Sequence, residues 1–137
     1  MPIEVDVVSP EKFNDWMQDQ KQVMVAAAAE ASMDKDWTME ELMEKGMANY
    51  NTKCASCHQI TGQGLPPAFP ALKGSALVTG PIPAHLDIVL NGMPGTAMQP
   101  WNSLNDLEIA AIVTYERNAW GNDAGDVIQP ADVKAAR

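Results

Sequence analysis

Residues 54–58 read Cys-Ala-Ser-Cys-His, and this stretch decides how we expect the rest of the chain to fold. Two thiols three positions apart can reach both vinyl groups of one porphyrin. The histidine that follows can then place a ring nitrogen on the iron from the same face. The pattern CxxCH therefore predicts a haem attached covalently to Cys54 and Cys57, with His58 as an axial iron ligand.

Two other sites use paired cysteines, and both fit this chain poorly. A thioredoxin-like CxxC needs a βαβ context, which the patterns around Cys54 do not indicate. A structural zinc site needs four ligands, but the chain has two Cys and two His in total, the second histidine being His85. An ordinary closed zinc site therefore cannot be completed.

A six-coordinate iron needs a second axial ligand, for which Met98, Met93 and His85 are the downstream candidates. A methionine is usually a flexible core residue, and this chain has nine of them. Position favours Met98, which lies between a Pro/Gly-bounded loop and the final predicted helix, far enough from His58 for the chain to wrap around a haem. Met93 and His85 remain alternatives, with His85 expected on the surface or packed against a loop.

Histidine and methionine together favour electron transfer over haem catalysis. Two strong axial ligands leave the iron no open position for dioxygen or peroxide, and a thioether raises the reduction potential relative to two histidines. The chain has only four Trp, two Tyr and two Phe among 137 residues. This scarcity of large side chains is compatible with a cofactor that fills part of the core.

Charge and hydropathy exclude several classes of partner. The formal net charge is −9, with eight acidic and three basic side chains in residues 1–37 but four and three in residues 38–100. Such a chain is not expected to bind nucleic acid or anionic membranes. No apolar run approaches the length of a membrane span. The N-terminus lacks the features of a signal peptide, so we expect a mature, excised or recombinant segment if the protein works outside the cytoplasm.

The first third of the chain predicts a short strand followed by helix. Residues 3–8 alternate apolar and acidic side chains, as a strand does. Ser9-Pro10 matches a helix start, and we interpret residues 18–36 as a helical or semi-flexible linker.

A second helix is predicted from Thr38 into Cys54. Thr38 and Glu41 form a capping box at its start. Gly46 lies in its middle, where glycine costs about 1 kcal/mol relative to alanine, and we take it to mark the close approach of another helix.

The remaining elements follow from turn and cap residues. Residues 61–83 are rich in Gly and Pro and predict an ordered loop. A short helix is expected over 83–90 and a second loop over 93–101. The last helix is expected to begin within Ser103-Leu104-Asn105-Asp106 and to stop near Gly121, leaving residues 122–137 as a polar tail.

Residues 38–120 resemble a class I cytochrome c domain. The resemblance includes CxxCH, the loop ending Phe69-Pro70-Ala71-Leu72-Lys73-Gly74-Ser75, the run Gly95-Thr96-Ala97-Met98 and the closing helix. It implies an all-α fold of three to five helices wrapped around one haem c. It also implies that the first and last helices cross at Gly46 and Tyr115. A proline carbonyl in such domains accepts a hydrogen bond from the proximal histidine, and we assign Pro67 to this role, with Pro66 as the alternative.

The N-terminal residues extend the resemblance to a larger protein. Met1-Pro2-Ile3-Glu4-Val5-Asp6-Val7-Val8-Ser9-Pro10-Glu11-Lys12-Phe13-Asn14-Asp15-Trp16 resembles the end of the cupredoxin domain of cytochrome c oxidase subunit II. Tyr115-Glu116-Arg117-Asn118-Ala119-Trp120-Gly121-Asn122 resembles the end of the cytochrome fused to that subunit in caa(3)-type oxidases. The cysteine pair and histidines of the copper site are absent, so no copper is expected in this fragment.

The resemblance implies residues 1–17 as a cupredoxin remnant, 18–37 as linker, 38–121 as cytochrome c domain and 122–137 as tail. The domain would not be an enzyme by itself. It would relay electrons from a donor cytochrome or a quinol-oxidising complex to the oxidase copper site, at the periplasmic or outer face of the cytoplasmic membrane. A free diffusible cytochrome is the alternative. Residues 38–120 carry seven acids and four bases, for which we expect weak and largely apolar docking.

Overall fold

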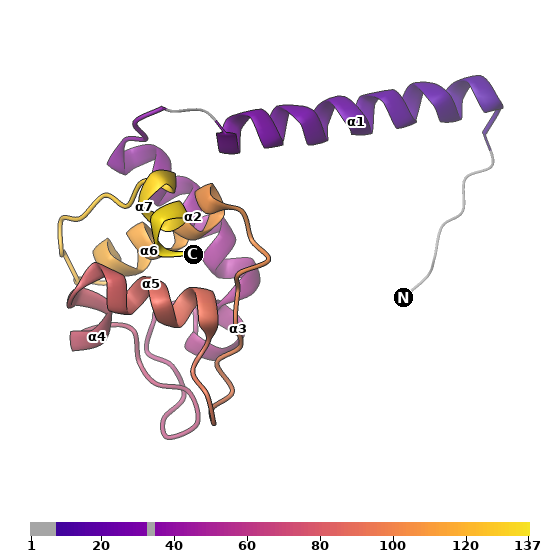
Figure 1. The fold of residues 1–137 in the computed structure, drawn as a ribbon. Helices are drawn as coiled ribbons and strands as arrows, with labels where there is room; N and C mark the ends of the chain where they lie inside the picture. Colours follow the sequence, from indigo (N-terminus) through magenta and orange to yellow (C-terminus); the bar gives the residue numbers. More distant parts are fainter. Residues whose placement is uncertain (1–7, 33–34) are drawn as a thin grey trace. The chain divides into compact units, whose positions relative to one another are not determined.

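The computed structural model describes residues 8–32 and 35–137, and within them every regular element is a helix. The prediction of an all-α fold is confirmed (Figure 1). The chain divides into two compact units, Met1–Met33 and Asp34–Arg137. The strand predicted over residues 3–8 lies almost wholly outside the described residues.

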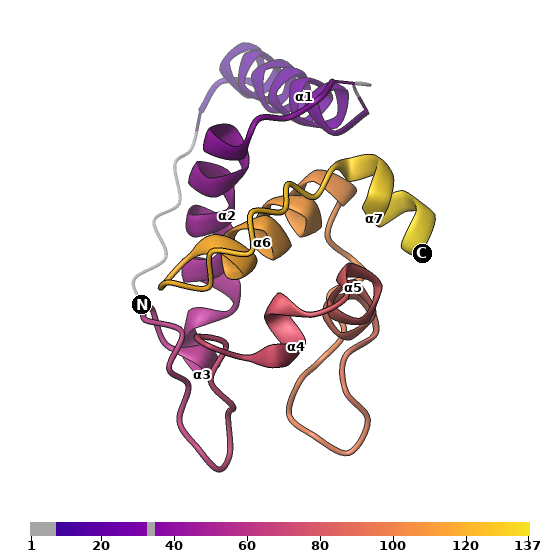
Figure 2. The same ribbon diagram turned by 90° about the vertical axis from the view of Figure 1, so that its left-hand side faces the viewer.

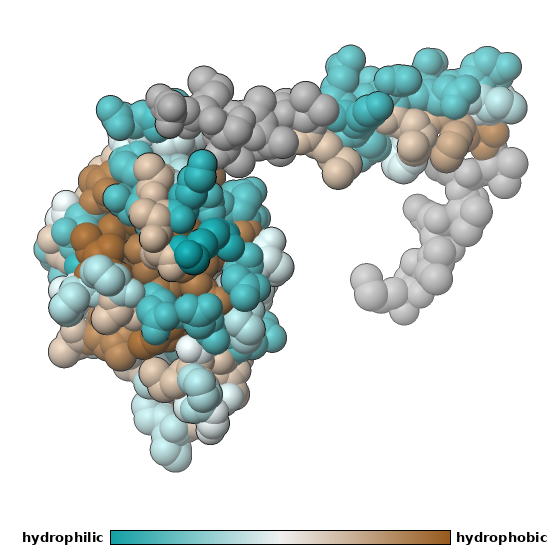
Figure 3. All heavy atoms as spheres, in the orientation of Figure 1, coloured by the Kyte–Doolittle hydropathy of each residue, from teal (hydrophilic) through white to brown (hydrophobic). Residues whose placement is uncertain are grey.

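The first unit contains one described helix, α1 (Pro10–Ser32). It begins at the predicted Ser9-Pro10 start, where the Phe13 N–H donates to the Ser9 carbonyl at 3.0 Å. The helix runs through residue 17 without interruption, so the expected boundary between remnant and linker falls inside one element. Figure 3 shows polar side chains along one edge of α1 and apolar ones along another. Phe13 and Trp16 of this helix are half-exposed.

The second unit is organised around α2 (Met39–Lys53) and α6 (Asp106–Asn118), which cross each other (Figure 2). The capping box predicted at Thr38 and Glu41 begins α2. A second box begins α6, but its N-cap is Asn105 rather than Ser103, because the Asn105 side chain accepts the Glu108 N–H while Glu108 accepts the Asn105 N–H. The sequence pattern thus located this helix start to within two residues.

Gly46 lies at the crossing of the two helices, as the sequence predicts. A Cβ atom at this position would lie 2.1 Å from the Ala111 carbonyl oxygen and 2.6 Å from Tyr115 Cβ. No side chain fits at such distances, so the missing Cβ is what allows the backbones of α2 and α6 to approach.

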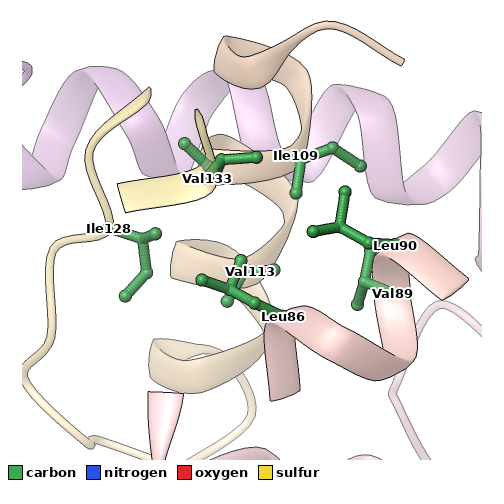
Figure 4. Packing of buried hydrophobic residues seen from close by; sticks show 8 residues of the cluster. Leu86, Val89, Leu90, Ile109, Val113, Ile128 and Val133 are labelled. Atoms are coloured by element: carbon green, nitrogen blue, oxygen red, sulfur yellow. The ribbon is translucent and has the colours of Figure 1, made fainter. Parts of the chain in front are cut away.

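The main hydrophobic cluster lies between α5 (Ile82–Asn91), α6 and α7 (Pro130–Ala136). Figure 4 shows its side chains meeting from these three helices and from the segment before α7. Its buried members are Leu86, Val89, Leu90, Ile109, Ala110, Val113, Ile128 and Val133.

The prediction of a polar tail over residues 122–137 is wrong. Ile128 and Val133 are 1% and 0% exposed and belong to the main cluster. Gln129 exchanges two 2.9 Å hydrogen bonds with the backbone of Trp37, where the second unit begins. Two apolar side chains in a polar stretch give almost no periodic signal. The sequence pattern therefore does not reveal that both side chains pack into the main cluster.

Two short helices and two long loops complete the unit. Helix α3 (Ala55–His58) follows α2 directly, and α4 (Ala76–Thr79) precedes α5. The loop from α3 to α4 and the loop from α5 to α6 extend from the same end of the unit (Figure 2). Among the described residues, no helix is both long and apolar enough to cross a membrane.

We predict that Gly46→Ala destabilises the haem-loaded protein by about 1–3 kcal/mol, the usual range for overpacking. The sign is diagnostic, because alanine alone would favour a helix by about 1 kcal/mol. Denaturant unfolding measures the change. Ala48→Val, at an exposed position of the same helix, should change stability by less than about 0.5 kcal/mol. Equal effects of the two variants would contradict the close crossing.

We also predict that Val133→Ala lowers the free energy of unfolding by about 1–2 kcal/mol, because it removes buried apolar surface from α7. Ala135→Ser on the exposed side of the same helix should be nearly neutral. If thermal and denaturant unfolding gave both variants the stability of the original protein, α7 would not be part of the folded core.

Candidate functional site

The CxxCH motif occupies the junction of α2 and α3. Cys54 caps the end of α2 and the start of α3. The N–H groups of Cys57 and His58 donate to the Cys54 carbonyl oxygen at 3.1 and 3.0 Å. The motif therefore forms one tight helical turn, and its two cysteines and histidine line the same cavity.

The His58 ring is held by the carbonyl of Pro70. Its Nδ1 lies 3.0 Å from the Pro70 oxygen, and the side chain is 9% exposed. A carbonyl oxygen can only accept, so Nδ1 carries a proton, and in the neutral ring the lone pair is then on Nε2. That is the tautomer that an axial iron ligand requires.

The assignment of Pro67, with Pro66 as alternative, as the partner of His58 is therefore corrected to Pro70. Leu65 and Phe69 exchange two backbone hydrogen bonds of 2.8 and 3.0 Å, which close a turn and place both earlier prolines at its exposed tip. The chain then returns to His58 at Pro70. Counting prolines after the motif could not reveal this turn.

Two aromatic side chains hold the backbone just after the motif. The Tyr50 hydroxyl donates to the Gln59 carbonyl at 2.7 Å, and the Trp120 indole N–H donates to the Ile60 carbonyl at 2.9 Å. With Tyr115 these rings form a cluster whose centroids are 4.9 to 5.5 Å apart. The sequence patterns did not predict that Tyr50 and Trp120 position the backbone after the motif. The one available signal is that aromatic residues are scarce in this chain.

The cavity beside the motif has a volume of about 660 Å³ and is mainly apolar. This size lies within the range of cofactor pockets. Its wall includes Phe69, Leu72, Val78, Ile112, Trp101 and Met98, together with the three motif side chains. Two thiols, a correctly protonated histidine and an apolar cavity of this size fit a haem held by thioether bonds.

The second loop brings both methionine candidates to this cavity. Met93 and Met98 both line it, but Met93 is exposed and Met98 is partly buried. The Met93 N–H donates to the Met98 carbonyl at 3.0 Å, and the Thr96 hydroxyl donates to the Met93 carbonyl while accepting the Met98 N–H. These bonds close residues 93–98 into a rigid turn.

The base of that turn is equally tight. Gly92 adopts φ of +71°, and a Cβ there would lie 2.6 Å from the Met98 carbonyl oxygen. Trp101 N–H donates to the Val89 carbonyl at 3.0 Å, which ties the end of the loop to α5. The turn is thus fixed at both ends, as a loop that presents a thioether to a metal needs to be.

His85 was expected on the surface or packed against a loop, and the surface position is wrong. His85 is 2% exposed, and its Nε2 lies 2.9 Å from the Glu116 carboxylate. His85 was the third candidate iron ligand, and its Nε2 is already engaged by Glu116. Neither residue's pattern in sequence indicated the pairing, because they lie on different helices 31 positions apart.

Burial and the nearby Glu116 carboxylate, in that order, raise the pKa of the free Cys54 thiol. The same two causes raise the pKa of the Tyr50 hydroxyl. Before haem attachment Cys54 is therefore a neutral thiol, and Tyr50 stays a hydrogen-bond donor to Gln59 across the physiological pH range.

A sequence profile for the family described as "Cytochrome C oxidase, cbb3-type, subunit III" matches residues 41–115. The match covers more than half of the chain and runs from α2 through the motif and both loops into α6. The chain belongs to this cytochrome c family. Its members carry covalently bound haem c, so the predicted cofactor is confirmed, and the activity of a cytochrome c domain is electron transfer.

Several curated proteins share this domain. The chain is 31% identical over 103 residues to the cytochrome c subunit of the quinone alcohol dehydrogenase of Gluconobacter oxydans. It is 33% identical over 110 residues to the cytochrome c subunit of the gluconate 2-dehydrogenase of Pantoea cypripedii. These alignments cover 67% and 69% of the chain but only 22% and 24% of the relatives.

A shorter relative is matched more completely. Cytochrome c-552 of Thermus thermophilus is 33% identical over 89 residues, which are 55% of the chain and 68% of that protein. The cytochrome c domain is therefore common to these proteins, whereas α1 has no place in the family match over residues 41–115.

We predict that Met98→Ala abolishes the weak long-wavelength band of Met–iron ligation in the oxidised holo-protein. The reduced variant should bind carbon monoxide promptly, because an axial position has opened, whereas the original protein should not. Met93→Ala is the matched control and should keep the band and exclude carbon monoxide. Loss of the band in Met93→Ala, with the band retained in Met98→Ala, would identify Met93 as the ligand and contradict the assignment of Met98.

Proposed function

We propose that this cytochrome c domain relays single electrons from a donor cytochrome or a quinol-oxidising complex to the copper site of an oxidase subunit II. Haem c supplies reversible one-electron chemistry when bound. The observation that carries the proposal is that both candidate iron ligands are fixed beside one cavity, His58 by Pro70 and Met98 within its turn. An iron held by both side chains would have no position left for a substrate.

The residues divide the work between attachment, ligation and orientation. Cys54 and Cys57 would hold haem c through thioether bonds, and His58 and Met98, which line the same cavity, would ligate its iron. Pro70 fixes the His58 tautomer. Ligands held in this way by the chain would need little rearrangement when an electron arrives or leaves.

The sequence and shape of α1 support attachment to a larger redox protein. A helix of 23 residues spans about 35 Å and acts as a semi-rigid spacer rather than a flexible one. Its exposed apolar side chains, among them Phe13, Trp16 and Met17, are more than a spacer alone needs. Together with the resemblance of residues 1–16 to the end of a cupredoxin domain, they support the fused arrangement at the outer face of a membrane.

A tether gives the haem a high effective concentration near its acceptor and replaces a diffusive encounter. Docking can then be weak. Leu77 and Met93 line the cavity and are 42% and 39% exposed, so the side chains available beside the haem include apolar ones. We therefore propose apolar contact, with little electrostatic steering.

A free diffusible cytochrome c is the second candidate, and the similarity to cytochrome c-552 over 68% of its length favours it. The relatives named as dehydrogenase subunits would suggest a dehydrogenase as electron donor. Only the tethered relay gives α1 a role.

We predict one-to-one electron transfer from the reduced holo-protein to a copper-loaded cupredoxin domain of a caa(3)-type subunit II, measured by stopped-flow absorbance. The rate should change little between low and moderate salt. Joining that domain to residue 1 should make the transfer independent of protein concentration. A steep fall of the rate with salt would contradict apolar docking, and absence of transfer in the joined protein would contradict the relay.

A further inference from the structure

The cavity wall contains one buried ionisable pair that haem attachment and iron ligation do not use. His85 on α5 and Glu116 on α6 are 2% and 4% exposed, and they lie 2.9 Å apart. Both side chains line the cavity among apolar neighbours such as Val78, Val89 and Ile112. His85 is also the only histidine besides His58 in the chain.

Apolar side chains would fill this part of the wall at lower cost. Removing a carboxylate from water costs several kcal/mol, and a buried ion pair is often no more stable than apolar residues of similar volume. The pair therefore contributes little to the stability of the fold.

The pair includes an unused proton position. With Glu116 ionised, His85 donates Nε2–H to the carboxylate, and its Nδ1 has no hydrogen-bond partner in the described part of the chain. A proton can bind at Nδ1 without breaking the contact to Glu116. The carboxylate then stabilises the imidazolium directly.

The charge of Glu116 reaches the haem attachment point. After burial, it is the next cause that raises the pKa of the Cys54 thiol and of the Tyr50 hydroxyl. Since His85, Glu116 and Cys54 line one cavity and electrostatic effects decline with distance, a charge on the pair would act on a haem bound at Cys54.

Lys53, Cys54, Cys57 and His58 line the same cavity as the pair. The elements that carry the pair or pack against it, together with the segment before α7, also hold Tyr50, Asp87, Tyr115, Arg117, Asp126, Asp132 and Lys134. Helix α4 has no ionisable side chain. Arg117 is engaged by Asp126 and by the Val78 carbonyl, and Asp132 accepts the Gln129 N–H.

We propose that His85 and Glu116 form a redox-linked proton site, in which His85 takes up a proton from solvent when the haem accepts an electron from its donor. The bond formed is Nδ1–H, and it breaks again when the electron leaves. Reduction lowers the positive charge at the iron by one, so a proton on His85 is repelled less. The inference rests on the proposed electron-transfer function.

Thermodynamic linkage makes the coupling measurable in both directions. The midpoint potential of the haem should be constant at low and high pH and should fall with rising pH over an intermediate range. If reduction strengthens proton binding roughly tenfold, the total fall is about 59 mV.

The test is a spectroelectrochemical titration of the holo-protein at successive pH values. His85→Leu/Glu116→Leu replaces the pair by apolar side chains and should give a potential that no longer changes in this range. Glu116→Gln removes the negative charge, so it should raise the potential and move the pH-dependent range to lower pH. Covalent haem and an intact Met–iron band verify that each variant is folded.

A pH-independent potential in the original protein would overturn the inference. So would a pH dependence that survives in the double variant, because it would then belong to the haem carboxylates. Ring NMR of His85 should also show tighter proton binding in the reduced state. If no reversible one-electron couple were found at all, the proposed function would fail; a reversible couple without pH dependence would remove only the proton site.

Discussion

The close crossing of α2 and α6 at Gly46 is the constraint on which the rest of the domain depends. A Cβ there would penetrate the Ala111 carbonyl and Tyr115, so the two backbones meet without an intervening side chain. The crossing places the end of α2, and with it Cys54, beside the aromatic cluster of Tyr50, Tyr115 and Trp120. That cluster in turn holds the backbone after the motif at Gln59 and Ile60.

The site itself depends on two turns that close on themselves. The Leu65–Phe69 turn returns the chain so that Pro70 meets His58, and the turn over residues 93–98 presents Met98. Neither turn relies on a long regular element. Each is fixed by a few backbone hydrogen bonds and by a glycine with positive φ, Gly64 in the first and Gly92 in the second. Such turns give a cofactor site rigid walls with little secondary structure.

Motifs with a local physical cause were predictable from sequence. CxxCH, the capping box at Thr38 and the small residue at the helix crossing each reflect interactions within a few residues or a required close approach. Pro70, the pairing of His85 with Glu116 and the anchoring of α7 were missed. Each depends on which distant segments meet, and no periodicity within one element records that. The polar character of residues 122–137 concealed two buried anchors for the same reason.

Methionine methyl NMR of the reduced, diamagnetic holo-protein tests the ligand assignment most directly. When a methionine sulfur binds the iron, its methyl group lies over the porphyrin, and the ring current shifts the methyl resonance far upfield. The methyl resonances of the other methionines, among nine in the chain, keep ordinary chemical shifts. The account predicts one displaced methyl, which disappears in Met98→Leu. The absence of any displaced methyl, or its assignment to Met93, would contradict a haem c ligated by His58 and Met98.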